Sequence, residues 1–148
     1  MYRNILVPID PEGLSDRALA HAMGLSGALG SRLTLMTVAD DIDPRAPFAA
    51  ETHEAQSGEI SPSRAAQMFH RAAGKLRHAG VAFDTCVYCG DKPWEGIAMA
   101  ADDHGCDLIV MASRGGEHMD GFVFGSVAAS VLTRCHVPIL VVKEPAEV

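Results

Sequence analysis

The chain lacks any apolar run that approaches the roughly 20 residues a membrane-spanning helix requires. It also does not open with a basic segment followed by an apolar one, the pattern of a secretory signal peptide. Basic residues are scarce: 12 lysines and arginines against 19 aspartates and glutamates give a net charge of −7. Because an acidic chain repels phosphate backbones and anionic lipids, we expect a cytoplasmic protein with no nucleic-acid partner and no membrane insertion.

Cysteine is also scarce, with four residues in 148. Cys86 and Cys89 have the C-x-x-C spacing, but residues 81–89 are typical of a strand, on which the two thiols point to opposite faces. No close-set second pair of cysteines or histidines completes a zinc site. We therefore expect reduced, buried thiols and no metal site formed by the protein alone; a functional C-x-x-C pair is the alternative. The seven histidines have no ligand spacing, and most should lie at the surface.

What the chain does contain is a regular alternation of strand and helix patterns in one domain, residues 1–148. Apolar runs predict strands at residues 4–9, 33–38, 81–89, 108–111 and 137–142. Helical patterns lie between them, except that residues 39–60 have no periodicity and predict a mobile loop. Five strands alternating with four helices predict an open, parallel α/β sheet with helices on both faces.

The helix boundaries have their own signals. Ser15, Ser61 with Pro62, and Lys92 with Pro93 mark helix starts, and Gly30, Gly80 and Gly105 mark helix ends. Apolar spacing predicts three buried faces: Ala18, Leu19, Ala22, Met23, Ser26 and Leu29; then Ala65, Met68, Phe69, Ala72 and Leu76; then Ile97, Ala98 and Ala101. Asp84 in the third strand indicates an edge or a half-exposed face.

The most informative stretch runs from residue 108 to residue 142. A buried strand leads into a glycine-containing loop, a helix that starts at Ser126, and a second buried strand. Main-chain N–H groups at the helix start, the Ser126 hydroxyl and the helix dipole favour an anion. A nucleotide phosphate is our first hypothesis, and simple turn chemistry at the glycines is the alternative.

Two motifs carry a family resemblance over essentially the whole chain. Ala112-Ser113-Arg114-Gly115, nine further residues and Gly125-Ser126-Val127, followed by the strand at 137–142, resemble the C-terminal signature of the universal stress protein family. Its ATP-binding members carry Gly, two residues, Gly, nine residues, Gly and Ser or Thr. Residues 1–10 look like the family's first strand. The resemblance implies a Rossmann-like sheet of strand order 3-2-1-4-5, with a ligand crevice between strands 1 and 4.

The resemblance also implies a site for ATP, with Mg²⁺ held only through the phosphates. The positions that match the family's site are Pro8, Ile9, Asp10, Val38, Met111, Ala112, Ser113, Arg114, Gly115, Gly125, Ser126 and Val127. Asp10 would accept hydrogen bonds from the ribose, or would only cap the turn that follows it. Two departures stand out: Ala112 replaces a glycine, and Glu117 and Asp120 make the spacer acidic, so that Arg114, His118 or Mg²⁺ must offset repulsion of a triphosphate.

A stress-response sensor or regulator that binds ATP is the function implied. The rivals are a dimeric interaction module that binds no nucleotide and, less favoured, a slow ATPase, since we find no P-loop lysine and no Ser/His/Asp pattern. The last strand is apolar although it should lie at a sheet edge, which predicts a homodimer through Val137, Ile139, Leu140, Val141 and Val142. Coverage of that edge by the chain's own last helix and tail is the alternative.

Overall fold

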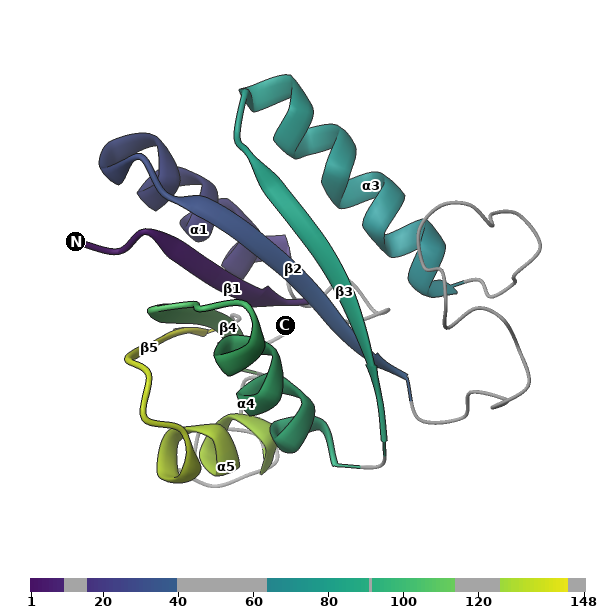
Figure 1. Cartoon of the computed structure of the whole chain (residues 1–148). Helices are drawn as coiled ribbons and strands as arrows, with labels where there is room; N and C mark the ends of the chain where they lie inside the picture. Colours follow the sequence, from purple (N-terminus) through teal and green to yellow (C-terminus); the bar gives the residue numbers. More distant parts are fainter. Residues whose placement is uncertain (10–15, 40–63, 91, 114–125, 144–148) are drawn as a thin grey trace, which may run out of the picture.

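The structure is a computed structural model that describes residues 1–9, 16–39, 64–90, 92–113 and 126–143. Helices and strands alternate along the chain (Figure 1). Their order is β1 (Asn4–Pro8), α1 (Asp16–Leu29), β2 (Arg32–Ala39), α3 (Arg64–Ala79), β3 (Phe83–Cys89), α4 (Pro93–Asp103), β4 (Leu108–Ser113), α5 (Ser126–Arg134) and β5 (Ile139–Lys143). The predicted loop at residues 39–60 lies outside the described residues, apart from Ala39 in β2.

All five strands are parallel and lie in the order β3-β2-β1-β4-β5, which confirms the predicted fold class. Two hydrophobic clusters cover the two faces of the sheet. One contains Ile5 and Val7 with residues of α1 and α3, and the other contains Leu6 with residues of α4 and α5. Successive side chains of β1 therefore enter opposite clusters, as the period of two in a strand requires.

Glycines end the helices as predicted. Gly30 and Gly80 have φ of 77° and 75°, a left-handed conformation that glycine adopts without a steric penalty. The Gly30 N–H donates to the Ser26 carbonyl at 2.8 Å and so closes the last turn of α1. Leu29, predicted to be buried, is 43% exposed because it is the last residue of its helix. The predicted caps Ser15 and Ser61 lie outside the described residues.

The other two predicted helix faces are confirmed in part. Ala72 and Leu76 of α3 are buried and Phe69 is half-buried, whereas the side chains of Ala65 and Met68 lie outside the description. In α4, Ile97 and Ala101 are buried as predicted, but Ala100 is buried where Ala98 was expected. Pro93 begins α4 and Lys92 provides no side-chain cap.

The sheet edges differ slightly from the sequence prediction. β4 continues two residues further than predicted, to Ser113, because Ala112 and Ser113 pair with Val142 and Lys143 of β5. β5 starts at Ile139 rather than at residue 137, directly after Pro138, which has no N–H for a ladder. β3 is the opposite edge of the sheet, as Asp84 indicated; the Asp84 carboxylate pairs with Arg32 at 2.8 Å.

The cysteines are all free, but they are not all buried as predicted. Cys106 is buried, Cys86 and Cys135 are half-buried, and Cys89 is exposed because it ends an edge strand. Burial raises the pKa of the Cys86 thiol to about 12. Within the described ranges, no group of three acidic, cysteine or histidine side chains is placed to hold a metal ion. No helix in the same ranges has both the length and the apolar character needed to cross a membrane.

Candidate functional site: the carboxyl edge between β1 and β4

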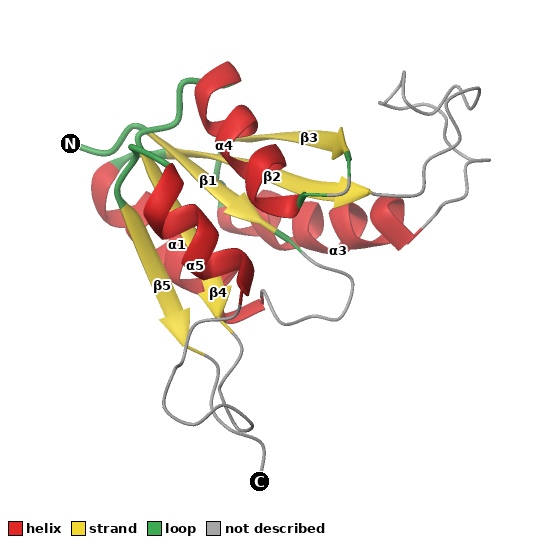
Figure 2. Cartoon of the chain, turned by 90° about the horizontal axis from the view of Figure 1, so that it is seen from below, coloured by secondary structure: helices red, strands yellow, loops and turns green. Residues whose placement is uncertain are grey.

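The carboxyl ends of β1, β2, β4 and β5 lie at one edge of the parallel sheet, and several predicted site residues lie there. Strand order reverses between β1 and β4, the kind of position where open α/β sheets bind ligands. In Figure 2 the arrows of β4 and β5 point downward, whereas those of β1, β2 and β3 run to the right. The residues that the structure brings to this edge are Pro8, Ile9, Val38, Met111, Ala112, Ser113 and, at the start of α5, Val127.

Other predicted site residues are not placed. Asp10, Arg114, Gly115 and Gly125 lie outside the described residues, as do Glu117, His118 and Asp120 of the spacer. Ser126 is the first residue of α5, but its side chain is not described. The start of α5 at this residue nevertheless confirms the predicted helix boundary.

Pro8 explains why β1 and β4 separate. The Ile9 N–H donates to the Met36 carbonyl of β2 at 2.8 Å, so the main chain of Ile9 faces β2. Main-chain groups alternate in direction along a strand, so Pro8 faces β4. Proline has no N–H to donate. The β1–β4 ladder accordingly ends at Leu6 and Ile109, although β4 continues to Ser113.

Val38 lies where the ladder between β1 and β2 has ended. Because the Met36 carbonyl faces β1, the main chain of Val38, two residues further, faces the same side. The described β1–β2 ladder ends with Pro8 opposite Met36. Its continuation would need an N–H from residue 11 for the Val38 carbonyl, and residue 11 is a proline. The Val38 side chain packs against the cluster on the α4 side of the sheet.

Ile9 is held by its main chain. Its N–H bonds Met36, and its carbonyl accepts a hydrogen bond from the buried Thr37 hydroxyl at 2.9 Å. The N–H and carbonyl of Ile9 are therefore both occupied, and its side chain is half-buried. The sequence prediction missed this contact of Thr37 with the Ile9 main chain; a threonine inside an otherwise apolar strand was the available signal.

The end of β4 presents alternating side chains. Met111 packs against the α4 side and is buried, whereas Ala112 packs against the α1 side and is half-buried. Ala112 is a paired strand residue, and strand backbone has negative φ. The replacement of the family's glycine by Ala112 therefore causes no backbone strain. Ser113 is 3% exposed.

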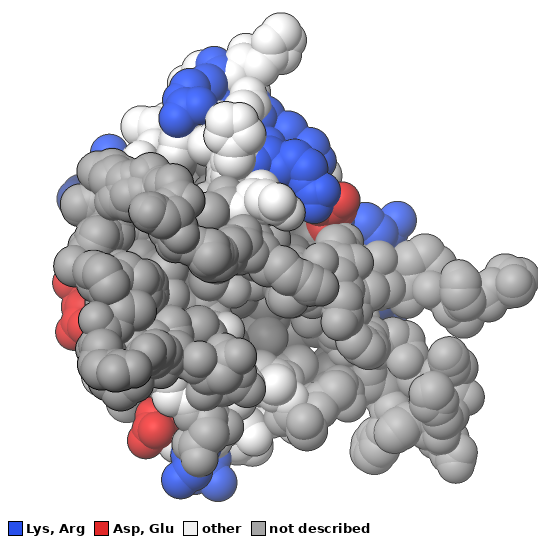
Figure 3. Space-filling view, turned by 90° about the vertical axis from the view of Figure 1, so that its right-hand side faces the viewer, with Lys and Arg blue, Asp and Glu red and all other residues white. Residues whose placement is uncertain are grey.

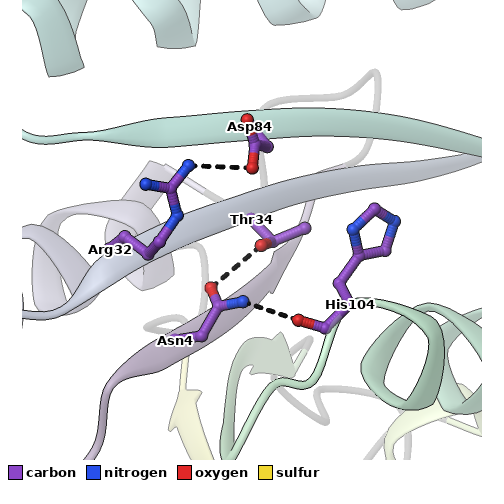
Figure 4. A network of polar contacts seen from close by, with 5 residues as sticks. All are labelled: Asn4, Arg32, Thr34, Asp84 and His104. Carbon is purple, nitrogen blue, oxygen red and sulfur yellow. Dashed lines mark hydrogen bonds and ion pairs between the residues drawn. The ribbon is translucent and has the colours of Figure 1, made fainter.

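A separate polar network holds the opposite, amino edge of the sheet (Figure 4). The Asn4 amide donates to the His104 carbonyl at 2.8 Å, and the Thr34 hydroxyl donates to the Asn4 side-chain oxygen at 2.9 Å. The Asp107 carboxylate accepts from the Arg3 and Asn4 N–H groups at 3.0–3.1 Å. Partial burial acts to raise the pKa of Asp107, but these hydrogen bonds outweigh it, so the pKa is lowered. These groups anchor the start of β1 and do not face the carboxyl edge.

The fold is an open, Rossmann-like α/β sheet, and the candidate site is the edge where its strand order reverses. The chain belongs to the universal stress protein family, whose family model matches residues 1–143.

Relatives resemble the chain along most of its length. Universal stress protein MJ0531 of Methanocaldococcus jannaschii is 27% identical over 145 residues, which cover 98% of this chain and 84% of that protein. A crystal structure of a universal stress protein in complex with cAMP has a TM-score of 0.71 at 23% identity and covers 97% of this chain and 98% of its own. A universal stress protein from Archaeoglobus fulgidus in complex with dAMP has a TM-score of 0.66 at 19% identity, with coverage of 96% and 98%.

Proposed function

We propose that this universal stress protein binds ATP at the carboxyl edge between β1 and β4 and acts as a stress-response sensor or regulator. The main chain of Val38 carries the proposal. Its N–H and carbonyl face the side on which β1 has ended, and a donor–acceptor pair of this kind matches the N1 and 6-amino groups of adenine. Guanine presents the opposite pattern at the same positions, so the site should prefer ATP to GTP. The structural neighbours in complex with cAMP and dAMP support an adenine ligand.

The phosphates belong, in this proposal, at the start of α5. The helix begins at Ser126, and its first N–H groups have no partner within the helix. Together with the helix dipole they favour a phosphate, and the glycines at 115 and 125 would let the ligand approach the main chain closely. Asp10 is assigned to the ribose, Arg114 to the phosphates, and Mg²⁺ to the phosphates only.

A dimeric interaction module that binds no nucleotide is the second candidate. The carboxylates of Glu117 and Asp120 favour it, because they would repel a triphosphate. Under either function we propose a homodimer through β5. This strand is a sheet edge, and Leu140 is 38% exposed, with Val137, Ile139 and Val141 half-buried. Val142 is 5% exposed in the chain's own core, so it would contribute to the dimer only through its main chain.

Calorimetric titration with Mg²⁺ and ATP, AMP or GTP tests the proposal. We expect heat of binding with ATP, a weaker signal with AMP and none with GTP. The Gly125→Val variant should lose ATP binding, because a branched side chain blocks the close approach of a phosphate. Gly27→Val is the matched control: Gly27 is an exposed helical residue with no atom within 4 Å of an added Cβ. Absence of heat with millimolar ATP would contradict the proposal and favour the interaction module.

A further inference from the structure

The outer face of α3 is positively charged although the protein is acidic. Four of the chain's 12 lysines and arginines lie in α3 and none of its 19 aspartates and glutamates, so the helix contributes +4 and the remainder carries −11. In Figure 3, Lys and Arg side chains lie on the upper part of the face shown, and acidic atoms lie between two of these basic groups. Within α3 itself, therefore, the charge is of one sign.

The described Arg, Lys and His side chains of α3 form two rows on the solvent side of the helix. Arg71, Lys75 and His78 follow the i, i+4, i+7 spacing of one row, and His70 and Arg77 form the second. All five side chains are exposed, and the two rows together cover about 12 Å of the helix axis, from residue 70 to residue 78. The exposed Gly74 lies between the rows, where an added Cβ would have no atom within 4 Å. The two rows therefore flank an open strip of main chain.

No described carboxylate forms an ion pair with a cation of this face. Among the described residues, the only ion pair within 4.0 Å joins Arg32 to Asp84, so the carboxylate next to Phe83 already has a partner. Arg77 lies over the Phe83 ring with its guanidinium carbon 5.7 Å from the centroid, which holds this side chain against β3. Like charges at i, i+4, as in Arg71 and Lys75, slightly destabilise a helix. A bound anion would remove this repulsion.

From the positive charge of α3, the rows with no described ion-pair partner and the open strip at Gly74, we propose that the outer face of α3 binds an acidic segment of a partner protein. Duplex nucleic acid or an anionic membrane would extend past one helix, and the net charge of −11 on the rest of the chain disfavours both of these polyanionic partners. The described exposed face also has no aromatic ring on which bases could stack, because Phe69 packs against the core. It has no large apolar side chain for insertion into lipid. A peptide segment of helix width, with carboxylates at i, i+4 spacing, matches both the length and the charge of the face.

Fluorescence anisotropy with a labelled helical peptide that carries a row of glutamates tests this inference, and the same peptide with glutamines is the control probe. We expect salt-sensitive binding of the glutamate peptide only, weaker at about 300 mM than at about 50 mM salt. Arg71→Gln/Lys75→Gln should weaken binding about threefold to thirtyfold, the range expected for two exposed charge contacts. Arg17→Glu is the matched control, since it also lowers the net charge by two units but lies on α1; it should bind as the wild type does.

Gly74→Leu separates charge from shape. The variant keeps every charged side chain of α3 but places a leucine side chain on the strip between the rows. It should therefore weaken binding of the glutamate peptide while leaving the helix content, measured by circular dichroism, unchanged. The inference would be overturned by binding of the glutamine peptide with equal affinity or by equal losses in Arg17→Glu. Tighter binding of a single-stranded oligonucleotide, a duplex or phosphatidylserine vesicles than of the glutamate peptide would overturn it as well, in favour of that ligand. Absence of peptide binding at millimolar protein would also refute it. None of these results depends on ATP.

Discussion

Replacing Pro8 with alanine should join β1 and β4 by one more hydrogen bond. Pro8 faces β4 but has no N–H, and the ladder between the two strands ends at Leu6 and Ile109. The Pro8→Ala variant has an N–H at this position, directed at β4. We expect this amide to bond β4 and to bring the carboxyl ends of the two strands closer together. If ATP binds between them, its affinity should fall.

The size of the effect follows from one main-chain hydrogen bond. Such a bond stabilises a folded protein by about 1 kcal/mol. Replacing the proline also makes the unfolded chain more flexible, which lowers the free energy of unfolding by about 0.4–1 kcal/mol. The two effects nearly cancel, so the free energy of unfolding should change little. A ligand that needs the strands apart must break the new bond, which weakens its binding by about 1 kcal/mol, or roughly fivefold.

Two measurements on the same protein check this reasoning. Hydrogen exchange followed by NMR should show a protected amide at position 8, and calorimetry should show the fivefold weaker binding of ATP. Pro138→Ala is the control, because Pro138 is exposed before β5 and its replacement changes the unfolded chain in the same way. An amide at position 8 that exchanges at the rate of an open loop would refute the ladder argument. A protected amide with unchanged ATP affinity would place the nucleotide elsewhere.

Three further predictions concern other parts of the molecule. Asp107→Ala should lower the free energy of unfolding by about 1–2 kcal/mol at neutral pH, because it removes partly exposed hydrogen bonds to the Arg3 and Asn4 N–H groups. Since the folded state lowers the pKa of Asp107, this contribution is present at neutral pH and is lost progressively as the pH falls below about 4. Denaturant melts in which the difference between the two proteins does not shrink between pH 7 and acid pH would contradict it. Leu140→Lys on the edge strand should give monomers in sedimentation, whereas Leu132→Lys on α5, where the leucine is similarly exposed, should not; a monomeric wild type at micromolar concentration would exclude the β5 dimer. Glu117→Lys/Asp120→Lys should tighten ATP several-fold, on the order of 1 kcal/mol per screened reversal, and an unchanged affinity by calorimetry would mean that these side chains do not face the phosphates.

Local sequence signals were sufficient to predict the order of strands and helices along the chain. Apolar runs and helical spacing predicted the five described strands and their intervening helices, and Gly30 and Gly80 marked helix ends because a positive φ is a property of a few neighbouring residues. The motif from Ala112 to Val127 was sufficient to identify the family, which the match over residues 1–143 confirms. Strand order came from that resemblance, since spacing along a chain does not say which strands pair.

Only the tertiary structure decided which groups face one another at the carboxyl edge. Pro8 ends a ladder because its missing N–H faces β4, and the direction of Pro8 depends on the register of β1 with β2. The same register leaves the Val38 main chain facing the side where β1 has ended, which no property of valine reveals. Cys89 is exposed and β4 extends to Ser113 for a similar reason, because each depends on which strand lies alongside. Exposure, pairing and the open side of a strand are set by contacts between distant segments, and these exist only once the sheet has formed.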